Sequence, residues 1–370
     1  RVLTRTSRVI IQMSTKIVFC GESWGEQEAL LQAPFVGAAG QELARMLSAA
    51  GYGNELLPYS FNSPARMLNY WHKFPYPLLN TFNARPPDND VTFFYAKPGD
   101  EVSKIFPQRK FDNSIYYVKA EYEHHITYLH ETLERLKPNV IIALGNTALW
   151  ALGLPTSVSK LRGNIVDSDF GKVLPTFHPA SVLRNWSQRV IAILDLHKAL
   201  RESTSRFIKT ISREIWTQPT IDDLYTWWAL HGTRTGLLAF DIETVGNKQI
   251  SEVSMAVDST HALHIPFFWK ENRQFINWWP DAKTELEAWK FIKMALESDV
   301  PKIGQNCCSY DAYWLAKEMK IGVRNIQHDT MQLSHAWQPE LEKSLRFLGS
   351  IFLNEKDWKS IRTDTNKQND

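Results

Sequence analysis

The chain has 370 residues, of which 44% are hydrophobic, and this is enough to build two buried cores. Its formal net charge of +2 at pH 7 excludes a strongly basic body that binds nucleic acid over its whole surface, so any DNA path must be a local stripe. Three cysteines do not make a disulfide framework, and no apolar run approaches the ~20 residues that cross a membrane, so we expect a cytoplasmic protein with no membrane partner.

The first residues predict an irregular start. Residue 1 is arginine, and Met13 is a natural start that leads directly into the first predicted strand. We therefore expect residues 1–15 to be a non-native or disordered leader, of which residues 1–12 are upstream sequence read through in frame.

Residues 16–204 alternate short apolar runs, such as 17–20 and 140–144, with helical stretches. This alternation predicts an α/β/α sandwich with a central parallel sheet. Cations gather over residues 198–218, before Pro219 and an acidic, aromatic helix, and we place the domain junction there. The expected linker helix region covers residues 205–234.

Several motifs with glycines and polar side chains follow the predicted strands of this first domain. The first strand runs into Gly21 and Glu22, where a glycine lets the backbone approach a ligand closely. Further motifs follow in chain order: Ala33-Pro-Phe35-Val-Gly37, Leu78-Leu-Asn80-Thr-Phe-Asn83, Ala143-Leu-Gly145, Lys160-Leu-Arg162-Gly163 and Pro175-Thr-Phe-His178-Pro-Ala-Ser181-Val-Leu-Arg184.

In this order, the motifs resemble the uracil-DNA glycosylase superfamily, closest to its family-four branch. The resemblance implies that Phe35 stacks on a flipped uracil and that the Asn80 amide reads the pairing edge of the base. It also implies that His178 donates to the uracil O2, while Glu22 orients water or stabilises the sugar cation. The implied uracil-binding and DNA-binding set also contains Arg162, Ser181 and Arg184, and the loop from residue 178 to 184 would press on the DNA backbone.

The chain departs from the family-four pattern at the ligands of an iron-sulfur cluster. That branch holds its cluster with four cysteines, whereas here Ala84 follows Asn83 and the next ligand region has His124 and His125. We therefore expect no iron-sulfur cluster.

A simpler interpretation of the same motif residues stays open. His178 can be a loop histidine capped by backbone, Phe35 a core residue and Glu22 an acid at a helix start. The domain would then be a non-catalytic module that grips DNA without excising uracil.

A second set of candidate residues is carboxylates in the later half of the chain. Asp241 and Glu243 end a predicted buried strand and lie two residues apart, hence on one face. A later short strand and turn lead to Asp311 at the start of a helix. Oxygen ligands of this kind suit Mg²⁺ or Mn²⁺, and two such ions ~4 Å apart promote phosphodiester hydrolysis. We expect all three carboxylates to be metal ligands and catalytic.

Together with Asn306, this set resembles the first two motifs of DnaQ-like 3′-5′ exonucleases, in the form found in family A DNA polymerases. The resemblance implies an RNase H-like domain with a mixed sheet over residues 235–370, single-stranded 3′ ends as substrate, and a DNA contact for Asn306. A third motif, Tyr-x-x-x-Asp, completes such sites, but no tyrosine follows Tyr313. We expect a two-metal site that is incomplete in a C-terminally truncated domain.

The two domains in this order resemble the N-terminal region of phage family A DNA polymerases. The resemblance implies DNA as partner, including uracil-containing DNA, a polymerase domain downstream, and the host cell cytoplasm. The alternative is a DNA-binding glycosylase-like module fused to a stand-alone DNA repair exonuclease. We assign Cys307 and Cys308 no role beyond filling a turn.

Overall fold

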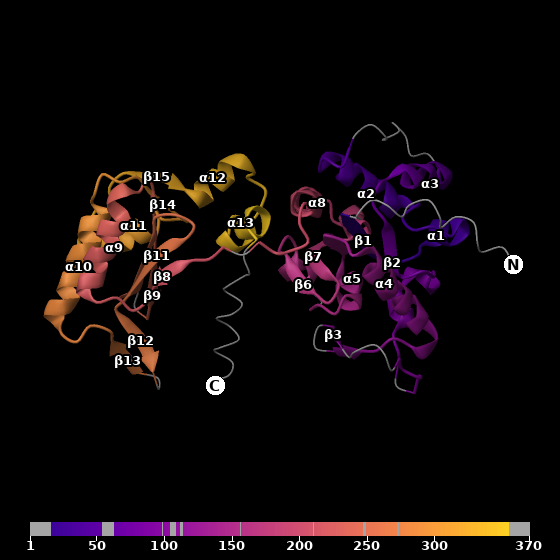
Figure 1. Cartoon of the computed structure of the whole chain (residues 1–370), viewed down its shortest axis with the longest axis horizontal. Coiled ribbons are helices and arrows are strands. Elements are labelled where there is room, and N and C mark those ends of the chain that lie inside the picture. The colour runs from indigo at the N-terminus through magenta and orange to yellow at the C-terminus, as the bar shows by residue number, and fades with distance from the viewer. Residues whose placement is uncertain are drawn as a thin grey trace. The chain divides into compact units, whose positions relative to one another are not determined.

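A computed structural model of the chain describes residues 16–53, 63–97, 99–103, 109–111, 114–155, 157–209, 211–246, 249–271 and 274–354. The chain divides into two compact units, Arg1–Lys209 with Gly349–Asp370, and Thr210–Leu348 (Figure 1). The expected leader, residues 1–15, lies outside the described residues. Among the described helices, none combines the length and the apolar character needed to cross a bilayer.

The first unit is built on a five-stranded sheet in the order β2-β1-β5-β7-β6. Its strands are β1 (Ile17–Ser23), β2 (Leu78–Phe82), β5 (Val140–Leu144), β6 (Val166–Ser168) and β7 (Gly171–Thr176). From β2 to β7 the neighbours run parallel, whereas β6 pairs antiparallel with β7. Because parallel strands end at the same edge, the loops that follow β1, β2 and β7 meet there.

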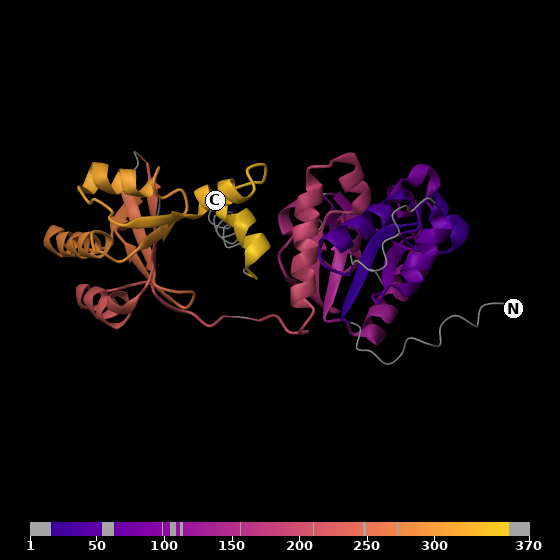
Figure 2. The same cartoon turned by 90° about the horizontal axis from the view of Figure 1, so that it is seen from above.

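Helices cover both faces of this sheet (Figure 2). Side chains alternate along β1, so Phe19 packs in one core with Leu47 and Leu196, whereas Val18 packs in a second core with Leu129. The helices are α1 (Glu26–Leu31), α2 (Ala38–Ala49), α3 (Pro64–Lys73), α4 (Glu123–Leu136), α5 (Asn146–Ala151), α6 (Val158–Leu161), α7 (Pro179–Arg184) and α8 (Gln188–Glu202). The expected α/β/α sandwich with a central parallel sheet is confirmed.

Shorter elements complete this unit. The hairpin of β3 (Arg109–Phe111) and β4 (Ser114–Tyr116) forms a separate two-stranded sheet. Short 3-10 turns are η1 (Pro87–Asn89), η2 (Val91–Phe94) and η3 (Ala120–Tyr122). Residues of η2 and η3 pack in or against a third, aromatic core that includes Phe82, Phe94 and Trp150.

The second unit contains a six-stranded mixed sheet in the order β15-β14-β9-β10-β11-β8. Its strands are β8 (Glu214–Trp216), β9 (Leu238–Val245), β10 (Gln249–Ala256), β11 (His261–Pro266), β14 (Lys302–Gly304) and β15 (Ile326–Asp329), with a hairpin of β12 (Phe268–Glu271) and β13 (Gln274–Asn277) beside them. The neighbours β9, β10 and β11 are antiparallel, whereas β14 runs parallel to both β9 and β15. The expected mixed sheet is therefore confirmed.

One hydrophobic core joins this sheet to its helices. Phe240 and Val253 from the sheet pack with Trp227 and Phe291 from two helices. The helices after residue 210 are α9 (Ile221–Leu230), α10 (Ala282–Leu296), α11 (Asp311–Met319), α12 (Thr330–Trp337) and α13 (Leu345–Phe352), with a 3-10 turn η4 (Gly232–Arg234) after α9.

The limits of the two compact units differ from those of the expected domains, which stay a prediction. The division at residues 209 and 210 falls within the expected linker region 205–234, and most of that region lies in the second unit. There β8 pairs with β11, and α9 buries Trp227 completely. At the other end, the described residues 349–354 group with the first unit, whereas the expected second domain covers residues 235–370.

Candidate functional site

Three side chains of the first unit meet at the carboxyl edge of its parallel sheet. Gly21 in β1 lies opposite Asn80 in β2, and a Cβ added to Gly21 would overlap the Asn80 Oδ1 and lie 2.5 Å from the Phe35 Cζ. The ring centroids of Phe35 and His178 are 6.2 Å apart. The structure therefore brings Phe35, Asn80 and His178 together. Glycine is needed at position 21 because the side chains of Asn80 and Phe35 leave no space for a Cβ there.

The side-chain oxygen of Asn80 is an unsatisfied acceptor. Asn80 is 3% exposed, and its Oδ1 is buried without a hydrogen-bond partner in the described part of the chain. Leaving a buried polar atom unpaired costs about 1–3 kcal/mol. An acceptor of this kind beside an aromatic ring fits a planar ligand that donates one hydrogen bond.

Phe35 is held in a strained backbone conformation. Its φ of 57° lies in the left-handed region, which bulky residues rarely adopt. The indole Nε1–H of Trp71 donates to the Phe35 carbonyl at 2.6 Å, and Gly40 approaches that carbonyl so closely that any Cβ would overlap it. Such strain persists where the surroundings over-determine it, which is typical of ligand sites.

His178 is the N-cap of α7, and its ring is positioned by the backbone. The Nδ1 accepts from the Ala180 N–H at 3.2 Å, so a neutral ring carries its proton on Nε2. Burial lowers the pKa of His178, while the charge of Glu22 raises it, Arg184 lowers it and Glu28 raises it. The backbone cap of the simpler interpretation is thus present, but it occupies only one ring nitrogen and leaves Nε2–H as a donor.

Two carboxylates act on this histidine. Glu22 Oε2 accepts from the Thr147 hydroxyl at 2.7 Å, which fixes the carboxylate that ends β1. Glu28 is buried, and its Oε1 accepts from the Gly37 N–H at 2.7 Å. Glu28 was not among the residues expected from the sequence, although the motif Gly25-Glu-Gln-Glu28 was visible, because its role depends on the distant glycine that it contacts.

The remaining candidates of this unit divide between surface and interior. Ser181 donates to Gln188 Oε1 at 2.7 Å, and Arg184 is exposed beside the exposed Leu183 and Trp186. Residues 179–184 form the helix α7 where the sequence predicts a loop, and the contacts of Ser181 and Arg184 with DNA stay predictions.

Arg162 lies in the interior of the first unit. Its side chain is 6% exposed, and its Nε donates to Asp195 Oδ2 at 3.0 Å in a buried ion pair. A guanidinium that is buried and paired in this way supports the fold of the first unit, and its expected DNA contact stays a prediction.

The positions that correspond to iron-sulfur ligands do not fit such a cluster. Ala84 packs on the aromatic core, in which the rings of Phe82 and Phe94 stack with centroids 4.2 Å apart. His125 meets Phe82 edge to face, and its pKa is lowered to about 4 by burial and by His124. Of the three cysteines in the chain, only Cys20 lies in residues 16–204, so four thiolates cannot gather here.

In the second unit, Asp311 lies beside the strand that carries the other two carboxylates. Asp241 and Glu243 are on β9, and the N–H of Ile242 between them donates to Asp311 Oδ1 at 2.8 Å. The pKa of Asp311 is raised to about 6, first by burial and then by the charges of Asp241 and Asp329, against the lowering effect of the Ile242 hydrogen bond. A carboxylate with such neighbours favours a proton or a cation.

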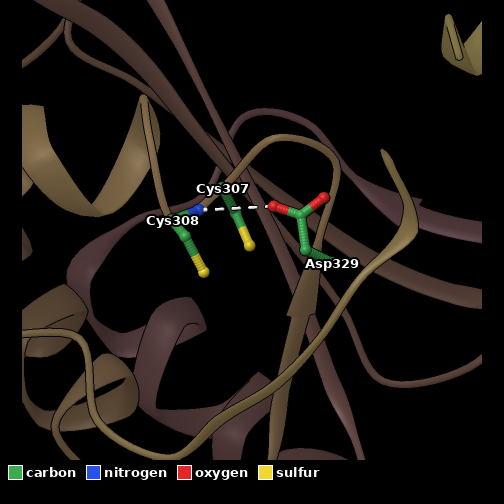
Figure 3. A group of neighbouring side chains, drawn as sticks. All are labelled: Cys307, Cys308 and Asp329. Carbon is green, nitrogen blue, oxygen red and sulfur yellow. Dashed lines mark hydrogen bonds between the residues drawn. The ribbon is translucent and has the colours of Figure 1, made fainter. Parts of the chain in front are cut away.

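The oxygen ligands of Asp241, Glu243 and Asp311 fit Mg²⁺ or Mn²⁺, and the charge of Asp241 acts on the Asp311 carboxylate. A second group of possible metal ligands lies in the same unit. Among the described residues, the possible ligand atoms of Cys307, Cys308 and Asp329 all lie within 4.8 Å of one another (Figure 3).

Asn306 shapes the turn before α11. Its φ of 57° is left-handed, which asparagine tolerates better than most residues, and its N–H donates to Asp329 Oδ1 at 2.9 Å. The next tyrosine, Tyr310, hydrogen-bonds Thr244 on β9 at 2.6 Å. The structure therefore assigns the backbone of Asn306 to the turn, and its expected DNA contact stays a prediction.

Comparison with known proteins gives one family match. Residues 10–202 match the uracil DNA glycosylase superfamily. The chain is 33% identical over 204 residues to a type-4 uracil-DNA glycosylase of Thermotoga maritima, covering 53% of this chain and 83% of that protein. It is 30% identical over 179 residues to a type-4 uracil-DNA glycosylase of Archaeoglobus fulgidus, covering 45% of this chain and 67% of that protein.

Solved structures similar to the chain include crystal structures of the EXD2 exonuclease domain. The one soaked in Mg has a TM-score of 0.26 and 17% identity, and it covers 42% of this chain and 83% of that chain. The one soaked in Mg and dGMP has a TM-score of 0.25 and 16% identity, and it covers 42% of this chain and 84% of that chain.

Proposed function

The chain belongs to the uracil DNA glycosylase superfamily, and on this premise we propose that its first unit excises uracil from DNA by cleaving the N-glycosidic bond. The observation that carries this proposal is the buried, unpartnered Oδ1 of Asn80 beside the ring of Phe35. A uracil turned out of the helix offers a flat face to the phenyl ring and an N3–H to that oxygen. Cytosine has no N3–H, so the same acceptor discriminates against it.

In the proposed reaction, His178 stabilises the negative charge that develops on the base, and Glu22 acts on the positive charge that develops on the sugar. As the bond breaks, negative charge builds on the uracil O2, where the Nε2–H of the neutral His178 donates. One well-placed donor of this kind is worth about 3 kcal/mol. The sugar becomes cation-like, and the Glu22 carboxylate, fixed by Thr147, stabilises it or orients the attacking water.

The test compares single-turnover release of uracil by two variants. His178→Ala should slow release about 100-fold to 1000-fold while the affinity for the oligonucleotide is retained. Glu26→Gln, which removes an exposed carboxylate at the start of α1, is the control and should leave the rate unchanged. A wild-type chain that binds the oligonucleotide but releases no base supports the DNA-gripping alternative instead.

For the second unit, we propose a metal-dependent 3′-5′ exonuclease. The support is the juxtaposition of Asp311 with Asp241 across the Ile242 hydrogen bond, together with the motif resemblance. Asp241, Glu243 and Asp311 would hold Mg²⁺ or Mn²⁺, which supplies an activated water and stabilises the leaving oxygen when bound. In a chain extended past Asp370, Asp241→Ala should abolish shortening of a 5′-labelled single strand, and residual shortening by that variant would argue against the assignment.

We further propose that both units serve a phage-type family A DNA polymerase, in which the exonuclease removes mispaired 3′ ends in the host cytoplasm. The order of the two units supports this proposal. Reading the gene beyond the codon for Asp370 tests it: a Tyr-x-x-x-Asp motif and a polymerase region should follow. A stop codon soon after would favour a stand-alone repair exonuclease fused to a glycosylase-like module.

A further inference from the structure

Two cysteines and an aspartate meet at one edge of the mixed sheet. Cys307 and Cys308 lie in the turn that follows β14, and Asp329 ends β15. The two strands are parallel neighbours in which Gly304 lies opposite Asp329, so their carboxyl ends coincide. Figure 3 shows the two thiols side by side and the Asp329 carboxylate next to them, joined to the Cys308 N–H, and the three possible ligand atoms lie within 4.8 Å of one another.

The position of Cys307 is fixed by close packing. Its side chain is fully buried, and a Cβ added to Gly304 would lie 2.5 Å from the Cys307 Cβ and 2.9 Å from its Sγ. Glycine at position 304 therefore makes the space for this thiol. Cys308, by contrast, is exposed, so the group is open to solvent on one side.

The carboxylate of Asp329 is oriented by backbone donors. Its Oδ1 accepts from the N–H groups of Asn306 and Met331, each at 2.9 Å. Its Oδ2 receives a long contact of 3.5 Å from the Cys308 N–H. The first oxygen thus holds the carboxylate in place, and the second is the one with capacity for a further partner.

We propose that Cys307, Cys308 and Asp329 form a binding site for a thiophilic divalent cation, with Zn²⁺ as the physiological ion. Two thiolates and one carboxylate oxygen provide three corners of a tetrahedron, and water reaches the fourth from the exposed side of Cys308. Sulfur ligands favour Zn²⁺ or Cd²⁺ over Mg²⁺, which prefers oxygen. The site is therefore chemically distinct from the carboxylate set of Asp241, and its two cysteines do more than fill a turn.

Such an ion would cross-link the ends of the two neighbouring strands β14 and β15. It joins the turn after β14 to the residue at which β15 becomes α12, and both thiols lose their protons when it binds. A cation that binds the folded chain and not the unfolded one raises its thermal stability. This consequence does not depend on exonuclease activity, so it can be measured whether or not the second unit cleaves DNA.

The experiment titrates the reduced, metal-free chain with Cd²⁺ as a spectroscopic probe for Zn²⁺. Thiolate binding produces an ultraviolet sulfur-to-cadmium charge-transfer band, which should saturate at one equivalent and be displaced by Zn²⁺. Mg²⁺ should produce no band. In parallel, Zn²⁺ should raise the melting temperature measured by calorimetry.

Three variants test whether these side chains are the ligands. Cys308→Ser changes an exposed side chain and should weaken Cd²⁺ binding at least about tenfold while the fold is kept. Asp329→Asn retains the oxygen that caps α12 and should also weaken binding. Cys20→Ala removes the buried cysteine of the other unit and should leave the band unchanged.

Two results would overturn the proposal. One is a wild-type chain that gives no band with Cd²⁺ at one equivalent. The other is a Cys308→Ser chain that binds Cd²⁺ as tightly as the wild type, because the thiol of Cys308 would then not be a ligand.

Discussion

At the scale of single residues, two residues of the glycosylase-like site have unfavourable arrangements that a purely structural site would avoid. Asn80 buries an oxygen that no described donor reaches, and Phe35 adopts a left-handed backbone conformation. Both features reduce the stability of the folded chain. They make sense if a ligand completes the hydrogen bond and stacks on the ring.

Asn80→Leu tests this interpretation. The substitution removes an unsatisfied acceptor and keeps a side chain of similar shape, so the free energy of unfolding should stay within about 1 kcal/mol of the wild-type value. Uracil release should nevertheless fall at least about 100-fold. Chemical denaturation and single-turnover assays measure the two quantities, and a large loss of stability with full activity would show that the amide is structural.

Asp311 gives a second residue-scale prediction, because its pKa is raised to about 6 by burial and by Asp241. The folded chain then binds a proton more tightly than the unfolded chain, so stability increases as the pH falls through 6 toward the ordinary value near 4. Asp311→Asn keeps the acceptor for the Ile242 N–H and removes the charge. It should stabilise the metal-free chain by about 1–3 kcal/mol at pH 7 and abolish this pH dependence.

Denaturation curves of both chains between pH 7 and pH 5 provide the measurement. The raised pKa of Asp311 would be contradicted by a wild-type stability that does not change over this interval. It would also be contradicted by an Asp311→Asn chain that is less stable than the wild type at pH 7.

At the scale of elements, the sequence patterns predicted what depends on local order along the chain. The resemblance to the uracil-DNA glycosylase superfamily assigned Phe35, Asn80 and His178 to one site, and the parallel strands bring their motifs together because their carboxyl ends meet at one edge. Arg162 could not be placed this way, because its partner Asp195 follows 33 residues later and decides that the cation is buried. Glu28 and Asp329 were missed for the same reason, since their roles come from contacts with distant backbone N–H groups.

The structure of the expected linker helix region, residues 205–234, also depends on contacts that are distant in the sequence. The three-residue strand β8 has no signal of its own, and it is a strand because it pairs with β11. α9 begins with a capping box between Thr220 and Asp223, a local signal, but whether it is a linker or a core helix depends on what Trp227 contacts.

Trp227→Ala therefore tests the membership of α9. Trp227 is fully buried in the core of the second unit, and its truncation should cost about 3–5 kcal/mol in the unfolding of that unit. Tyr225 lies on the same helix and is 41% exposed. Tyr225→Ala is therefore the matched control and should cost less than about 1 kcal/mol. Equal, small effects of both substitutions would mean that α9 is a linker after all.

At the scale of the whole molecule, the two proposed activities depend on different chemistry in separate units. We propose an aromatic ring, an amide, an imidazole and a carboxylate for the first, and carboxylates that suit a divalent cation for the second. Chelation should therefore separate the two activities: EDTA should abolish shortening of 3′ ends and leave uracil release unchanged. Loss of both activities in EDTA would contradict this division.

Uracil excision at the site of Phe35, Asn80 and His178 is the activity proposed for the first unit. The most direct measurement is chromatographic detection of free base after incubation of the chain, in EDTA, with an oligonucleotide that contains one uracil, and with a matched oligonucleotide that contains thymine in its place. We predict release of uracil from the first and no base from the second. Binding of both oligonucleotides without release of any base would contradict the claim.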